Sequence, residues 1–260
     1  MKIRSVRAVA DLGILKGATG ARIVEGADGK TYVMKFAGRD RAAVNELIGQ
    51  ALARSVGLPA PESVFVEVTE QFAAGLPHVA SGPVSPGIHH GSELISGAMD
   101  MSQFGRRQLN PGELLLNPEA LLASVCHDNW VLTKDRDRDD NHLIYPVAGG
   151  FRYSMVDFSH CFTGTAWTAD SVEQGTFLRV LMPVHPIIAE LVRDAGAFSL
   201  TLDRIEGCGD SDIHEVVSAV PESWGVSDEE RSCLEGFLQV RRGLVRSILD
   251  ANASVFPNWR

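Results

Sequence analysis

The chain has 260 residues, of which 45% are hydrophobic and 22% charged, and its formal net charge is −9. This composition fits a soluble globular protein large enough for one large domain or for two small lobes that share a cleft. The acidic balance provides no positive field to attract phosphate backbones or anionic lipid, so a nucleic-acid partner is not expected.

The spacing of the cysteines and the length of the apolar runs argue against a zinc protein and a membrane-spanning protein. The four cysteines lie far apart, without a CxxC pair or a Cys/His cluster, so we expect reduced, mostly buried thiols and no zinc site. Asp11, Gly13 and Lys16 interrupt the N-terminal apolar run, no small-residue cleavage site follows, and no apolar run approaches 18 residues. A cytoplasmic protein without a membrane span is therefore the simplest expectation.

The first 36 residues predict an antiparallel β-meander. Alternating apolar residues indicate strands at residues 3–9, 21–25 and 31–36. The Asp28-Gly29 pair between the second and third of these strands is a strong hairpin signal.

A helix with one buried face is predicted over residues 39–56, where apolar residues recur at the i, i+3, i+4 and i+7 positions. The alternating pattern returns at residues 62–68 and predicts a strand. Residues 71–112 are rich in Gly, Pro and Ser, so we expect one more strand near residues 76–81 within an otherwise irregular connection.

Beyond Pro118 the pattern becomes mainly helical. Ser227 and Glu230 make a capping box at the start of the last predicted helix. The elements expected in this part are helices at 119–134, 186–196, 212–220 and 227–253, and a pair of short strands at 142–146 and 151–158.

The order of elements predicts an α+β protein with unlike halves. A β-rich N-terminal lobe with one helix is expected at residues 1–85, a connector or hinge region at 86–112, and a helical C-terminal lobe at 113–260. There is no internal repeat.

The charged run KDRDRDDN at residues 134–141 has three interpretations. An EF-hand would use Asp135, Asp137 and Asp139, but the run lacks the glycine and the final Glu that a calcium loop needs, so calcium is not expected. Alternating charge is usually a solvated turn. The third interpretation, the catalytic loop of a phosphotransferase, is favoured by residues elsewhere in the chain.

Phosphoryl transfer uses a glycine-containing loop, a strand lysine, a helix glutamate, a catalytic Asp, and an Asn and second Asp for magnesium. Lys35 is the lone cation of an apolar strand, and Glu46 on the next helix is the acid that a buried lysine requires. A surface lysine and a surface helix acid remain the alternative. Gly17, Thr19 and Gly20 are candidates for an anion-binding loop, although they form neither a Walker motif nor GxGxxG.

Five blocks resemble successive motifs of the HipA-like kinase family: YVMKF, VNELIGQALARSVGLPAPES, HHGSELISG, HDNWVLTKDRDRDDNHLI and YSMVDFSHCF. They cover roughly residues 13–165, and the length is similar to that of the short branch of the family. The resemblance implies a bilobal protein-kinase-like fold with ATP and Mg between the lobes. It also implies that Lys35 contacts the nucleotide phosphates, that Glu46 pairs with Lys35, and that Asn141 and Asp157 bind the metal.

The sequence departs from the family pattern at the catalytic Asp. Counting from Trp130 places it at Asp135, yet Asn141 lies six residues further on, where the pattern has five. The loop has an extra residue with Asp135 catalytic, or is one residue short with Asp137 catalytic, or uses Asp140 in place of the Asn. Asp135 is favoured because the helix that ends at Trp130 fixes its position.

The expected function is ATP-dependent phosphoryl transfer to a hydroxyl, with protein Ser or Thr as the first acceptor to consider. A small-molecule or lipid acceptor is an alternative, since the fold does not choose the substrate. The expected partners are a nucleotide and a protein or small-molecule acceptor. Two non-enzymatic alternatives are a nucleotide-binding pseudokinase that regulates a partner and an acidic interaction domain without nucleotide affinity.

Overall fold

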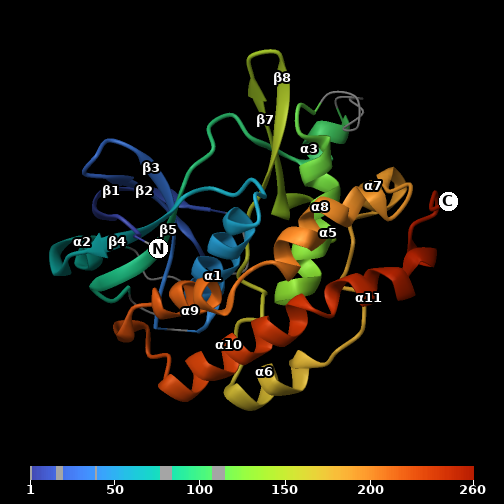
Figure 1. Cartoon of the computed structure of the whole chain (residues 1–260). Helices are drawn as coiled ribbons and strands as arrows, with labels where there is room; N and C mark the ends of the chain where they lie inside the picture. The colour runs from blue at the N-terminus through green and yellow to red at the C-terminus, as the bar shows by residue number, and fades with distance from the viewer. Residues whose placement is uncertain (1, 16–19, 39, 77–83, 107–114) are drawn as a thin grey trace.

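The computed structural model describes residues 2–15, 20–38, 40–76, 84–106 and 115–260. Strands β1 to β5 gather on one side of the molecule and helices α5 to α11 on the other, with α1 between them (Figure 1). A short hairpin, β7 and β8, projects beside α3 (Figure 1). The α+β class expected from the sequence is confirmed.

Five strands form one closed sheet in the order β1-β2-β3-β5-β4. Strand β1 runs antiparallel to β2 and parallel to β4, and the remaining neighbours are antiparallel. The predicted turn joins β2 to β3, and Gly29 adopts there the positive φ of 75° that glycine tolerates best. The strands are β1 (Ser5–Ile14), β2 (Arg22–Gly26), β3 (Thr31–Lys35), β4 (Ser63–Val68) and β5 (Gly87–Glu93).

Helix α1 (Ala42–Ser55) lies between this sheet and the helical part (Figure 1). Its residues from Ala42 to Ala53 are all buried, which is more than one apolar face would bury. The helix therefore has neighbours on every side, and its polar side chains need partners inside the protein.

The helical part is built around α5 (Pro118–Val131), in which Trp130 is fully buried and donates from Nε1 to the carbonyl of Leu238 at 2.9 Å. A second sheet has the order β6-β7-β8. The remaining strands are β6 (Met99–Asp100), β7 (His142–Val147) and β8 (Gly150–Met155). The other helices are α2 (Glu70–Gly75), α3 (Met101–Arg106), α6 (Ala169–Thr176), α7 (Pro186–Leu191), α8 (Gly196–Glu206), α9 (Asp210–Ser218), α10 (Asp228–Arg242) and α11 (Val245–Ala251), with 3-10 turns η1 (Asp139–Asn141), η2 (Glu222–Trp224) and η3 (Ala253–Val255).

Several expected elements differ in the structure. The single helix expected at residues 227–253 is wrong: it is divided into α10 and α11, with Gly243 capping α10. Strand β8 ends at Met155, earlier than expected, because Asp157 adopts a positive φ of 57° that a strand cannot contain. The capping box of Ser227 and Glu230 is confirmed.

The greatest difference lies in residues 71–112. Strand β5, within the range expected as connector, pairs with both β3 and β4 and belongs to the closed sheet. Its sequence, GIHHGSE, lacks the alternation of large apolar residues that marks a strand. The strand expected near residues 76–81 falls almost wholly outside the described residues.

All four cysteines are free, and Cys126, Cys161 and Cys208 are buried as expected. Within the described ranges, no helix has the length and apolar character needed to cross a bilayer.

Candidate functional site

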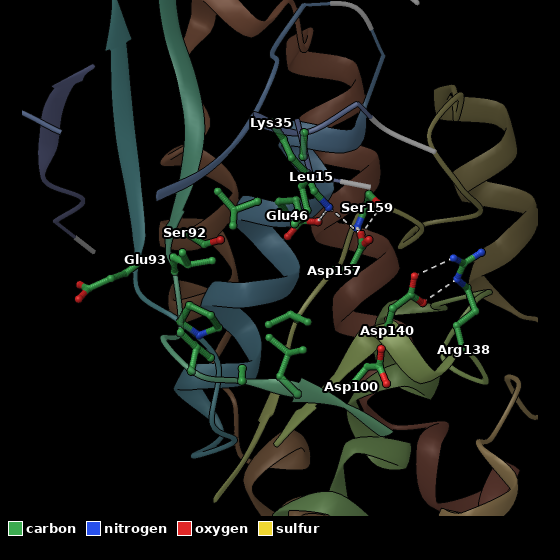
Figure 2. A pocket seen from close by; sticks show the side chains of 18 of the residues that line it. Leu15, Lys35, Glu46, Ser92, Glu93, Asp100, Arg138, Asp140, Asp157 and Ser159 are labelled. Atoms are coloured by element: carbon green, nitrogen blue, oxygen red, sulfur yellow. Dashed lines mark hydrogen bonds and ion pairs between the residues drawn. The ribbon is translucent and has the colours of Figure 1, made fainter. Parts of the chain in front are cut away.

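A cleft of about 350 Å³ opens between the closed sheet and the loops around β7 and β8 (Figure 2). This volume lies within the range of small-molecule sites. One group of lining side chains is charged: Lys35, Glu46, Glu93, Asp100, Asp135, Arg138, Asp140 and Asp157. A second group is apolar: Leu15, Ala21, Val33, Leu94, Ile95, Leu143 and Val156.

Lys35 ends the apolar strand β3 and is buried, with only 7% of its surface exposed. Its Nζ donates to Glu46 Oε1 and, at 2.7 Å, to Asp157 Oδ1 (Figure 2). Burial alone would lower the pKa of Lys35, but the two carboxylates raise it above its ordinary value. The lysine is therefore a fixed positive charge in the cleft wall, and the surface alternative for Lys35 and Glu46 is wrong.

Glu46 occupies the buried face of α1 and links three segments. Besides pairing with Lys35, its Oε1 accepts a hydrogen bond from the backbone N–H of Phe158 at 2.9 Å. A strand, a helix and the residues after β8 thus converge on one carboxylate. Such charge-assisted bonds in a buried site hold their partners more tightly than neutral ones.

Asp157 is held from both sides. Its Oδ1 accepts from Lys35 Nζ and from the N–H of Ser159 at 3.3 Å, and the Ser159 hydroxyl donates to the same atom. Burial would raise the pKa of Asp157, but the Lys35 ammonium holds that pKa below its ordinary range. Its φ of 57° is uncommon for a non-glycine residue, and such backbone outliers cluster at functional sites.

Asp135 lines the same cleft from the loop after α5. Its Oδ1 is buried without a hydrogen-bond partner, and Oδ2 lies 4.0 Å from His160 Nε2. Burial raises the pKa of Asp135, and the neighbouring charge of Asp157 raises it further. Asp135 thus contributes a partly buried carboxylate to the cleft that Lys35 and Asp157 also line.

The loop is held in register by Arg136, whose guanidinium is buried. Its Nε donates to Asp128 Oδ1 on α5 at 3.0 Å, and its Nη1 donates to the carbonyls of Asn141 at 2.9 Å and Val156 at 2.6 Å. Burial would raise the pKa of Asp128, but Arg136 keeps that pKa below its usual value. One side chain therefore sets the spacing between Asn141 and the residue that precedes Asp157.

The other carboxylates of the loop lie differently. Asp137 is exposed and does not line the cleft, whereas Asp140 lines the cleft and accepts two bonds from Arg138, at 3.0 and 2.8 Å (Figure 2). Asn141 is buried, and its Nδ2 donates to the carbonyl of Asp135 at 2.8 Å. The turn η1 accommodates the six-residue spacing between Asp135 and Asn141.

The candidate phosphate loop connects β1 to β2. Its flanking residues Leu15 and Ala21 are joined by a 2.8 Å backbone hydrogen bond, and both line the cleft. Gly20 has a φ of 61°. Gly17 and Thr19 lie outside the described residues. Arg22, the first residue of β2, forms a part-buried ion pair with Asp11 of β1.

Of the two residues expected to bind magnesium, Asp157 lines the cleft, whereas Asn141 is buried and is not among the residues that line it. The described residues contain no group of three or more His, Cys, Asp or Glu that could hold a metal by themselves. Magnesium fits such a sparse set, because it is commonly held by one or two carboxylates together with waters and substrate phosphates.

Two functional candidates escaped the sequence patterns. Asp128 and Asn45 are buried polar residues on the two central helices, and both hold segments of the site through hydrogen bonds. The available signal was polar residues within otherwise buried helical runs, HDN in α5 and NE in α1.

Comparisons with known proteins give the family and the fold of the chain. The family model of the HipA-like kinases matches residues 12–251, so the match extends past the recognisable motifs into the helical part. A Helicobacter pylori proinflammatory kinase, CtkA, superposes with a TM-score of 0.59 at 11% identity, covering 97% of this chain and 98% of that one. A hydra Fam20 structure with sugar gives a TM-score of 0.51 at 11% identity, covering 96% and 86%.

At such low identity the two structures show a shared kinase-like fold and nothing finer. A search among curated proteins finds no match. The family model spans most of the chain, and it confirms the resemblance of the five sequence blocks. The chain belongs to the HipA-like kinase family and is a kinase, a phosphotransferase enzyme.

Proposed function

We propose that this protein is an ATP- and Mg-dependent kinase that phosphorylates a hydroxyl group, with Ser or Thr of a protein as the acceptor. The observation that carries the proposal is the convergence of Lys35, Glu46, Asp135 and Asp157 on one cleft, from four separate segments of the chain. In this proposal the closed sheet and the helical part act as two lobes, with the nucleotide between them.

The lining of the cleft supports a nucleotide. The apolar group, with Val33 from the sheet and Leu143 from β7, suits the faces of a purine ring. Lys35 is charged and buried beside it, as contact with phosphate oxygens requires. The loop with Gly17, Thr19 and Gly20 is proposed to cover the phosphates through its backbone N–H groups.

Asp157 and Asn141 are proposed to hold the metal. Bound Mg²⁺ supplies neutralisation of the negative charge on the phosphate oxygens. The protein contributes the placement of both ligands, since Arg136 binds the carbonyl of Asn141 and the carbonyl next to Asp157. Asp157 would hold the metal with the carboxylate that here accepts from Lys35, so the Lys35 ammonium would be available to contact phosphate.

The proposed transfer needs few chemical groups. The acceptor hydroxyl oxygen bonds to the γ-phosphorus, the bond from that phosphorus to the bridging oxygen breaks, and ADP leaves. Asp135, whose side chain is 19% exposed, takes the hydroxyl proton on its carboxylate. Asp137 and Asp139 beside it are exposed, so the acceptor side of the loop borders the protein surface, as a polypeptide acceptor requires.

The test is transfer of label from γ-labelled ATP, with Mg²⁺, to the protein itself, to generic Ser/Thr protein substrates and to a panel of small alcohols. Asp157→Asn should lower the rate of phosphoryl transfer by about 10²-fold or more while the protein stays folded, because the substitution removes the negative charge proposed to bind the metal. Phosphoamino-acid analysis identifies the acceptor. Absence of turnover in the wild-type protein despite nucleotide binding would contradict the proposal, and labelled small alcohols alone would reassign the acceptor.

A further inference from the structure

Asn45 lies on α1, one residue before Glu46, and is completely buried. Its Nδ2 donates to three backbone carbonyls, those of Ser159 at 2.6 Å, Cys161 at 3.1 Å and Gly164 at 3.0 Å. Its Oδ1 accepts from Trp167 Nε1 at 2.7 Å. Every hydrogen-bonding atom of this side chain is thus directed at the residues that follow Asp157.

Other contacts along α1 reach the same segment. The N–H of Arg41 donates to the carbonyl of Thr165 at 2.8 Å, and the Arg41 guanidinium lies 4.8 Å from the centre of the Trp167 ring. A Cβ added to Gly49 would come within 2.9 Å of Phe158 Cβ, so the helix packs directly on that side chain. The segment from residue 157 to 167 therefore contacts α1 and its N-cap from Arg41 to Gly49, over about two helical turns.

The opposite helix supports this arrangement. His127 on α5 contacts the carbonyl of Gly49 with Nε2 at 3.0 Å, and its ring meets the Phe158 ring edge-on with centroids 5.5 Å apart. Phe158 is fully buried between the two helices. Movement of α1 would consequently have to carry the 157–167 segment with it.

We propose that Asn45 is a positioning residue that joins α1 to the segment after Asp157, so that Glu46 and Asp157 keep a fixed relation to Lys35. The inference rests on the proposed function of these three groups as the phosphate site. Without the Asn45 amide, the carbonyls of Ser159 and Gly164 and the Trp167 N–H lose the hydrogen bond that Asn45 provides, while the Cys161 carbonyl keeps the N–H of Gly164. The hydrogen bonds left between the two segments would be those of the Phe158 N–H to Glu46 and of the Arg41 N–H to Thr165.

A purely structural role predicts a different outcome, and the same helix offers the control. Gln50 is also buried, but its Oε1 accepts from Ser63 Oγ at 2.6 Å and contacts His90 Nε2 at 3.1 Å. It therefore joins α1 to the sheet and makes no hydrogen bond to residues 157–167. Truncation of either side chain removes buried polar contacts, while only Asn45→Ala releases the segment.

The experiment compares Asn45→Ala and Gln50→Ala by thermal unfolding, by hydrogen exchange of residues 157–167, and by kcat and KM for ATP. Both variants should unfold at a lower temperature. Asn45→Ala alone should raise exchange in the segment by about tenfold or more and lower kcat by about tenfold, with KM for ATP changed less than about threefold. Because neither substitution alters the apolar walls of the cleft, KM for ATP should change little in either variant.

Equal exchange in Asn45→Ala and wild type, or equal kcat in the two variants, overturns the inference. If Asn45→Ala does not fold, Trp167→Phe removes one of the four bonds and should raise exchange in the segment more than Gln50→Ala does. A wild-type protein without turnover would contradict the proposed function, whereas the exchange measurement would still decide whether Asn45 holds the segment.

Discussion

Two Asp-Arg pairs stand side by side in the loop after α5, and the structure treats them in opposite ways. Asp135 faces the cleft and Arg136 is buried against Asp128, whereas Asp137 is exposed and Arg138 forms an exposed pair with Asp140. The dipeptides are identical, so their own chemistry does not separate them. The difference arises from Asp128, a carboxylate on the preceding helix that only one of the two arginines reaches.

The strongest way to break this comparison is to remove each aspartate in turn. Asp135→Ala should reduce kcat by about 10²–10⁴-fold, because it deletes the proposed acceptor of the hydroxyl proton. Asp137→Ala should leave kcat within about twofold. Both are measured by phosphoryl transfer under saturating ATP. Loss of activity in Asp137→Ala alone would show that the second pair is the functional one.

The two arginines should differ in stability. Arg136→Ala leaves Asp128 buried without its partner, which costs about 3–5 kcal/mol of the free energy of unfolding. Arg138→Ala breaks a solvated pair worth no more than about 1 kcal/mol. Urea unfolding followed by fluorescence measures both. Similar losses in the two variants would mean that Arg136 does not hold the loop.

Titration of the carboxyl groups should sharpen the contrast. The pKa of Asp135 is raised by burial and by Asp157, while that of Asp140 is lowered by its hydrogen bonds to Arg138. Ionisation of Asp135 therefore costs stability as pH rises through its pKa. Asp140 stabilises the fold above its unfolded-state pKa, and that stability is lost as pH falls through its folded pKa.

Carboxyl ¹³C NMR during acid titration, with assignment by Asp135→Asn and Asp140→Asn, gives both values. Asp135 should titrate above the ordinary aspartate value of 3.8 and Asp140 below it. The acidic limb of kcat/KM should follow Asp135, because a protonated carboxyl cannot accept the hydroxyl proton. A pKa of Asp135 below that of Asp140 would contradict the placement of Asp135 as the more buried of the two carboxyl groups.

Much of the fold could be predicted from local sequence. The β2–β3 hairpin follows from Asp28-Gly29, and the helix α1 follows from its apolar spacing. Strand β5 could not be predicted in this way, since GIHHGSE becomes a strand through its pairing with β3 and β4. The segment is a strand because of its tertiary contacts, and residue propensities do not include such contacts.

The candidate site shows the same division. Lys35, Glu46 and Asp157 were identified by residue type and order, and the structure brings them into contact. The register of the loop stayed open among three alternatives, because deciding it requires knowing where Arg136 finds its counter-ion. The sequence of the loop alone does not reveal that its buried partner, Asp128, lies on another element.

The close approach of Gly49 to Phe158 makes this position intolerant of substitution. In the middle of a helix, Ala is ordinarily favoured over Gly by about 1 kcal/mol. Here an added methyl group would meet Phe158 at 2.9 Å and Cys161 Sγ at 3.2 Å. A design that relied on helix propensity alone would replace Gly49 with alanine to stabilise this kinase. The added methyl group would instead force α1 away from Phe158 and Cys161.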